Sequence, residues 1–186
     1  ALASALFCAK NGVSFVIDHH ASPFAVEGSL LTIKDALESV GLSHLLCYEI
    51  TDRDGEAVRD KGLEETRAYL AAGNQGHVGL HASFTVGDYL LEKAVLLAND
   101  LSSGIHIHVA EDKADQDHCL KTYNKRVIQR LSDAGALSFG KTILGHGLHL
   151  DDAEKALLRQ SPAWVVQSVE SNLNNNVGLT DYSTYG

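Results

Sequence analysis

The chain has 186 residues, 45% of them hydrophobic and 21% charged, which is typical of a globular domain and atypical of a disordered chain. A formal net charge of -9 and the lack of a basic stripe argue against nucleic-acid binding. No apolar run is long enough to span a membrane and no signal-peptide pattern is present, so we expect neither a membrane protein nor an exported one. A cytoplasmic protein with reduced thiols at Cys8, Cys47 and Cys119 is the expectation.

Strand-like and helix-like segments alternate along the whole chain. After a first apolar segment that resembles the middle of a helix, short β-branched runs predict strands at 13–17, 44–50, 78–84, 105–110, 142–150 and 163–169. Helical patterns separate them, at about 27–40, 60–72, 87–102, 114–134 and 151–160. Gly41 stands where a glycine often ends a helix, and Asp151 where a carboxylate begins one. Thr85 is expected to cap helix 87–102, with Asp88 completing a capping box.

This alternation predicts an α/β fold with a parallel sheet in a single domain spanning 1–186. Several of the strands are apolar at nearly every position, as expected when both faces of a sheet are covered. An open doubly wound sheet and a (β/α)8 barrel share this pattern. The basic residues Lys121, Lys125, Arg126 and Arg130 are expected to form a solvated helix face rather than a binding patch.

Polar residues gather at the predicted strand ends. In a barrel, the active site is built from the carboxyl ends of several strands. Here those ends carry Asp18, His19, His20, Glu49, His81, His106, His108, Glu111, His146, His149, Glu170, Ser171 and Asn172. Histidines that converge at one rim are what a metal site or a proton-transfer site needs.

The motif HIHVAE at 106–111 carries the clearest chemistry. Side chains alternate along a strand, so His106 and His108 share one face, while Ile105 and Ile107 face the helices. Neutral imidazole is a good ligand for Zn²⁺ or Fe²⁺, and a carboxylate three positions after His108 could move a proton between water and a leaving group. Two core histidines followed by a helix-capping Glu111 would give the same pattern.

Four further motifs remain open between a functional and a structural interpretation. His146, between two glycines, could polarise a bound oxygen or ligate a second metal, whereas His149 suits a loop. His81 could contact substrate or make a structural hydrogen bond. In DHHASP, at most one of the paired histidines faces the interior, and Pro23 suits a helix start. The run ESNLNNNVG at 170–178 fits either turns and caps or a substrate-binding loop.

Taken in their order along the chain, DHHASP, YEITDRDG, GLHASFT, HIHVAE, GHGLHL and SNLNNNVG resemble the amidohydrolase superfamily. The resemblance is to the branch of chlorohydrolases, guanine deaminases and adenosylhomocysteine deaminases, and within it to aminohydrolases associated with selenium metabolism. It implies a (β/α)8 barrel that holds one divalent metal ion, Zn²⁺ or Fe²⁺, and hydrolyses C–N bonds of a small heterocyclic substrate. It also implies site roles: metal ligand for His108, proton shuttle for Glu111, orientation of hydroxide or substrate for His146, and substrate contact for His81 and Asn172.

The sequence departs from this family at three places. The metal-binding His-x-His of the first strand would precede Ala1, and the Asp of the eighth strand would follow Gly186. The usual His-Asn-Pro of the seventh strand reads Gln167-Ser168-Val169. We therefore expect a partial barrel of about six strands that lacks the first and last, is inactive by itself, and forms aggregates or homo-oligomers through its unpaired edges. Two other functions stay open: an inactive barrel with a binding or accessory role, and a two-metal hydrolase of another branch.

Overall fold

A computed structural model describes residues 1–185 of the chain, and its elements alternate as the sequence predicts. The strands are β1 Phe15–His20, β2 Ser43–Tyr48, β3 Val78–Ala82, β4 Ile105–Val109, β5 Ile143–His146 and β6 Trp164–Val166. The α-helices are α1 Leu2–Lys10, α2 Ser29–Ser39, α3 Glu56–Ala71, α4 Asp88–Asp100, α5 Lys113–Tyr123, α6 Val127–Asp133, α7 Asp152–Arg159 and α8 Val169–Asn174. Three 3₁₀ turns are η1 Ser83–Thr85, η2 Ala136–Ser138 and η3 Tyr182–Tyr185.

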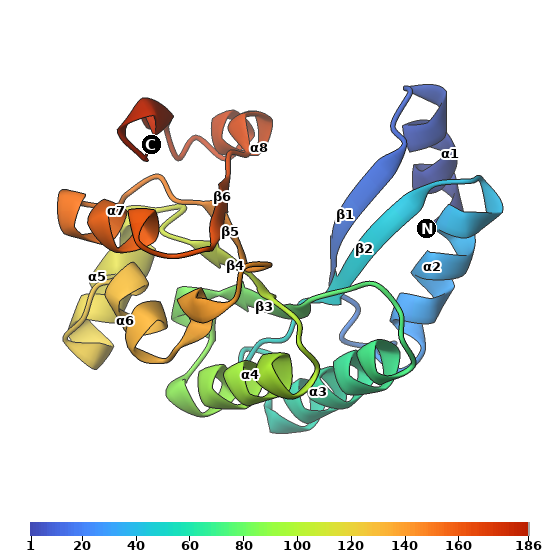
Figure 1. Cartoon of the computed structure of the whole chain (residues 1–186), viewed down its shortest axis with the longest axis horizontal. Coiled ribbons are helices and arrows are strands. Elements are labelled where there is room, and N and C mark those ends of the chain that lie inside the picture. The colour runs from blue at the N-terminus through green and yellow to red at the C-terminus, as the bar shows by residue number, and fades with distance from the viewer. Residues whose placement is uncertain (186) are drawn as a thin grey trace.

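The strands run parallel and lie side by side in chain order. β1 pairs with β2, and β3 to β6 form a continuous ladder. Two parallel bridges, Leu46 to Gly76 and Ile50 to Leu80, join the two sheets. Figure 1 shows the result as an arc of strands with helices α2 to α7 on its outer side. This is the expected α/β architecture of a partial (β/α) barrel, with β1 and β6 at the two ends of the arc.

Residue alternation in the strands decides what each face of the arc carries. Ile105, Ile107 and Val109 of β4 are buried in the apolar core. His106 and His108 of the same strand lie on the opposite, concave face, as predicted. Burying the apolar face against the helices stabilises the sheet by roughly 25 cal/mol per Å² of apolar surface removed from water. The packing of this outer face therefore fixes the positions of the polar side chains on the inner one.

Several predicted helix ends are confirmed. Gly41 follows α2 with a φ of +79°, a left-handed conformation that glycine adopts at little cost. Asp151 caps α7 and forms a reciprocal capping box with Glu154. Helix 114–134 was one segment in the prediction but is two in the structure, because Asn124 takes a left-handed φ of +53° and ends α5.

Other local predictions are wrong. Thr85 does not cap α4, which begins after Gly87; its hydroxyl bonds within η1, while Asp52 accepts the hydrogen bond of the Gly87 amide. Pro23 lies in a turn well before α2. The stretch from Val169 to Asn174 is a helix, where the sequence left turns and caps or a substrate-binding loop open.

Arg130 also corrects the prediction of a solvated basic face. The residue is 3% exposed, and its guanidinium donates to the carbonyl oxygens of Ser83 and Val86, at 3.0 and 2.7 Å. It pairs with Asp88 and lies 3.8 Å over the ring of Tyr123. Arg130 thus ties α6 to the segment that follows β3, and this segment carries part of the site described below.

The ends of the arc carry exposed apolar side chains. Phe15 and Ile17 on β1 and Trp164 and Val166 on β6 are all more than two-fifths exposed. Such edges can pair with further chains, so an oligomer through these strands stays a prediction. Among residues 1–185, no helix combines the length and apolar character needed to cross a bilayer.

Candidate active site

Histidine rings from four strands contact one another on the concave face of the sheet. The ring of His19, from β1, lies 4.6 Å from that of His106 and 4.5 Å from that of His108. His108 lies 6.1 Å from His81 of β3 and 5.2 Å from His146 of β5. Parallel strands present their carboxyl ends at one rim, which is why residues far apart in sequence meet here.

Burial keeps several of these rings neutral. Desolvation, together with the neighbouring His106 and His108, lowers the pKa of His19 to about 2. Burial also lowers the pKa of His106 and of His108 to about 4. Near neutral pH these three imidazole rings are therefore uncharged. Each has a nitrogen lone pair that can bind a cation.

His108 lies at the centre of the cluster. Its buried Nδ1 has no hydrogen-bond partner within residues 1–185. Gly145 on the neighbouring strand makes room for the ring, since a Cβ built there would lie 2.9 Å from Nδ1. Position 145 carries no side chain, and this leaves room for the ring of His108.

His146 is held by several contacts at the end of β5. Its backbone has a φ of +71°, a left-handed conformation that costs a non-glycine residue roughly 1–2 kcal/mol. Its Nδ1–H donates to Asn172 Oδ1 at 2.7 Å, and its carbonyl accepts the Tyr182 hydroxyl at 2.7 Å. The Tyr185 hydroxyl donates to the next carbonyl, that of Gly147. Because Nδ1 donates to Asn172, Nε2 is the ring nitrogen of His146 that remains free to bind.

Glu111 lies just beyond β4 and faces that free nitrogen. Its Oε2 is 3.7 Å from His146 Nε2. Its other oxygen accepts a hydrogen bond from Asn175 Nδ2 at 3.0 Å. The carboxylate is one-third exposed, so it can exchange protons with a ligand or with water.

His81 is oriented by the turn that follows β3. Its Nδ1 lies 2.7 Å from Thr85 Oγ1, and its Nε2 is 3.9 Å from Glu49 Oε1. Burial lowers the pKa of His81, and the positive charge of Arg53 adds to this effect. Thr85, predicted as a helix cap, instead positions this histidine.

The structure brings together His81, His108, Glu111 and His146, four of the five residues singled out from the sequence. The fifth, Asn172, lies behind His146 and is fully buried, with its Oδ1 already engaged. Sequence reasoning did not select His19 or Glu49 as site residues. Both stand at strand ends, and that position was the signal that could have found them.

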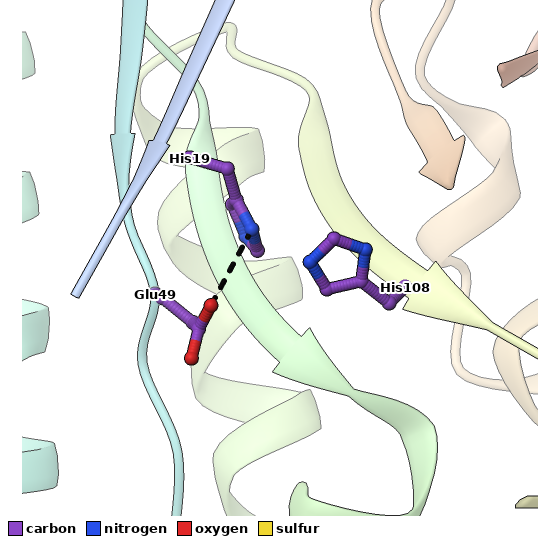
Figure 2. Close-up of side chains that lie close together, drawn as sticks. All are labelled: His19, Glu49 and His108. Carbon is purple, nitrogen blue, oxygen red and sulfur yellow. Dashed lines mark ion pairs between the residues drawn. The ribbon is translucent and has the colours of Figure 1, made fainter. Parts of the chain in front are cut away.

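His19, Glu49 and His108 form a compact set of electron-pair donors, shown in Figure 2. One donor atom from each lies within 4.8 Å of the others. The pair His19 Nδ1 and Glu49 Oε2 is 3.6 Å apart. Burial raises the pKa of Glu49, and the nearby Arg53 offsets part of that shift.

Comparison with known proteins agrees with this geometry. The family model described as "Amidohydrolase family" matches residues 3–182. A 5-methylthioadenosine/S-adenosylhomocysteine deaminase of Caldanaerobacter subterraneus subsp. tengcongensis is 30% identical over 148 residues, which are 76% of this chain and 34% of that protein. A 5'-deoxyadenosine deaminase of Methanoregula boonei is 30% identical over 151 residues, or 74% of this chain and 33% of its own length. The chain thus spans about a third of the length of these relatives.

Solved structures establish the fold. A guanine deaminase from C. acetobutylicum with bound guanine superposes with a TM-score of 0.87 at 13% identity, covering 98% of this chain and 46% of the other. An atrazine chlorohydrolase from Arthrobacter aurescens TC1 complexed with zinc gives a TM-score of 0.82 at 15% identity, covering 99% and 45%. Strand order, parallel register and the family match over nearly all of its residues lead to one conclusion: this chain belongs to the amidohydrolase family.

Proposed function

We propose that the protein contributes the proton-transfer groups and one metal ligand to an aminohydrolase that hydrolyses a C–N bond of a small nitrogen heterocycle. The observation that carries the proposal is the meeting of His108, His146 and Glu111 at one rim. The printed names of the relatives support the reaction class, since they are deaminases of adenosine derivatives.

The residues present fit one divalent metal ion. His108 directs a ring nitrogen toward His19, as Figure 2 shows, and burial keeps its imidazole neutral. A neutral imidazole beside carboxylates suits Zn²⁺ or Fe²⁺. Such an ion, when bound, acts as a Lewis acid that makes water more acidic and thus a stronger nucleophile near neutral pH.

Glu111 is the proposed proton shuttle. Its partly exposed carboxylate can accept a proton as water attacks the ring carbon, and can deliver it to the departing nitrogen. The hydrogen bond from Asn175 holds one oxygen and leaves the oxygen that faces His146 free to react.

His146 is the proposed orienting group. Because Asn172 accepts its Nδ1–H, Nε2 presents a lone pair toward the region next to Glu111. A donor such as water or a substrate N–H placed between them would be held by both groups. Asn172, expected from the family resemblance to contact substrate, is better placed to hold His146, because its side chain is fully buried.

His81 is the proposed substrate contact. Thr85 fixes its Nδ1, so Nε2 is directed toward the interior of the arc near Glu49. An imidazole in this position can hydrogen-bond a ring nitrogen of a heterocyclic substrate.

The test is ammonia release by the zinc-loaded full-length protein from 5'-deoxyadenosine, S-adenosylhomocysteine and guanine. Glu111→Gln keeps the shape of the side chain but removes proton transfer, so we expect turnover to fall by about 10²–10⁴-fold. Glu170→Gln, at an exposed carboxylate on α8, is the matched control and should retain wild-type turnover. Near-wild-type turnover by Glu111→Gln would remove the assigned role. Zinc binding without ammonia release from any substrate would favour an inactive barrel with a binding role.

A further inference from the structure

The tautomer of His19 is fixed by its surroundings. Its Nε2 lies 3.2 Å from the carbonyl oxygen of Leu80, and a carbonyl can only accept a hydrogen bond. The ring proton is therefore on Nε2, and Nδ1 carries a lone pair.

That lone pair faces a carboxylate oxygen. His19 Nδ1 and Glu49 Oε2 are 3.6 Å apart, which is beyond hydrogen-bond distance. The other oxygen of Glu49 lies 3.8 Å from Arg53 Nη2 and 3.9 Å from His81 Nε2. Since Arg53 is more than half exposed, it neutralises the buried carboxylate only in part. Two electron-pair donors that face each other beyond hydrogen-bond distance leave a site for a cation.

His108 supplies a third donor on the same side. Figure 2 shows its ring facing His19 and Glu49, with a ring nitrogen directed toward them. One ligand atom of His108 lies within 4.8 Å of ligand atoms of His19 and Glu49. We propose that His19, Glu49 and His108 together bind one divalent cation of the zinc type. This inference rests on the proposed function, because His108 belongs to both, and it adds two ligands that neither the motifs nor the family resemblance assign.

The spacing of the donors fits such an ion. Zinc bonds of about 2.0–2.2 Å place two ligand atoms of a tetrahedral site about 3.4 Å apart. The 3.6 Å between His19 Nδ1 and Glu49 Oε2 is close to that value. All three donors lie within 4.8 Å of one another, so closing the set shortens any donor separation by about 1.4 Å at most. Two imidazoles with one carboxylate favour Zn²⁺ or Fe²⁺ over Mg²⁺ and Ca²⁺, which prefer all-oxygen sites.

The test measures zinc binding directly by titration calorimetry, and cobalt as a spectroscopic probe through its visible absorption bands. The protein is first stripped with a chelator. We expect Glu49→Gln and His19→Gln each to weaken zinc binding at least tenfold and to alter the cobalt spectrum. The matched control is Glu38→Gln, since Glu38 also pairs with a histidine, His44, at 3.3 Å but at the surface. The control should bind within twofold of wild type. Circular dichroism checks that each variant is folded.

The outcomes separate this inference from the proposed function. If His108→Gln abolishes binding while the His19 and Glu49 variants bind zinc and cobalt as wild type does, the added ligands are refuted and the proposed metal role of His108 stands. If folded wild-type protein binds no zinc, the three-donor site is refuted, and ammonia release by the full-length enzyme decides the proposed function separately. Loss of binding in all three variants, with the Glu38 control unchanged, supports the site.

Discussion

Replacing Asn172 by Ala tests whether the Asn172 side chain holds His146 in place. Both side chains are buried, at 0% and 4% exposure, and one hydrogen bond of 2.7 Å joins them. The variant leaves the Nδ1–H of His146 without an acceptor, which costs about 1–3 kcal/mol. The lost packing adds about 1 kcal/mol. We therefore expect the free energy of unfolding to fall by about 2–4 kcal/mol.

Urea denaturation measures this change. With a slope of about 2 kcal/mol per M, the midpoint should fall by roughly 1–2 M. Turnover of the zinc-loaded full-length enzyme should fall by about 10–100-fold, the usual effect of removing a partner that orients a site residue. Asn174→Ala, an exposed change on the same helix, should cost less than about 0.5 kcal/mol and leave turnover unchanged. If Asn172→Ala loses no more stability and turnover than this control, His146 is not held as we argue.

Three further changes probe the neighbourhood of the site. Arg130→Met removes the hydrogen bonds to the carbonyl oxygens of Ser83 and Val86 and the buried ion pair with Asp88. Urea denaturation should therefore show a loss of about 3–5 kcal/mol, whereas a loss below about 1 kcal/mol contradicts that view. Gly145→Ala puts a Cβ 2.9 Å from His108 Nδ1, so calorimetry should show zinc affinity reduced at least tenfold; unchanged affinity would mean that the ring moves freely. Burial raises the pKa of Asp115 to about 6, so the folded state holds its proton more tightly than the unfolded state does. Its contribution to stability is therefore present at low pH and lost as pH rises through about 4 to 6. Relative to Asp115→Asn, wild type should lose up to about 3 kcal/mol over that window, and parallel stability curves would refute the shift.

The fold could be predicted because it depends on repeated patterns. Apolar runs and the spacing between them indicate which segments become strands and which become helices. Boundaries depend on single contacts instead. The break between α5 and α6 follows from the left-handed conformation of Asn124, which no periodicity reveals. Arg130 seemed a surface residue because its partners, two backbone carbonyls far away in sequence, are set by tertiary structure alone.

The site could be predicted only where chemistry and strand position coincide in one motif. His108 and Glu111 lie within the six residues of HIHVAE, so the alternation of β4 places His108 and the short separation along the chain keeps Glu111 near it. The meeting of His19 with Glu49 instead requires the parallel register of β1 and β2 and the bridges from β2 to β3. The register between strands cannot be read from one sequence, and this is why His19 and Glu49 were not predicted as site residues.

Glu111 and His146 are held in place by residues from a later part of the chain. The reactive groups come from strand ends, at positions 19 to 146, but the groups that hold Glu111 and His146 come from the last segment: Asn172, Asn175, Tyr182 and Tyr185. The left-handed turn at His146 is costly, and it persists because surrounding contacts over-determine it. Those contacts lie beyond β6, so the orientation of His146 depends on how α8 and η3 fold back over β5. Loosening this segment should therefore disturb proton transfer at Glu111 and His146 first. The donors His19, Glu49 and His108 should be affected later, because they lie in β1, just beyond β2 and in β4, respectively.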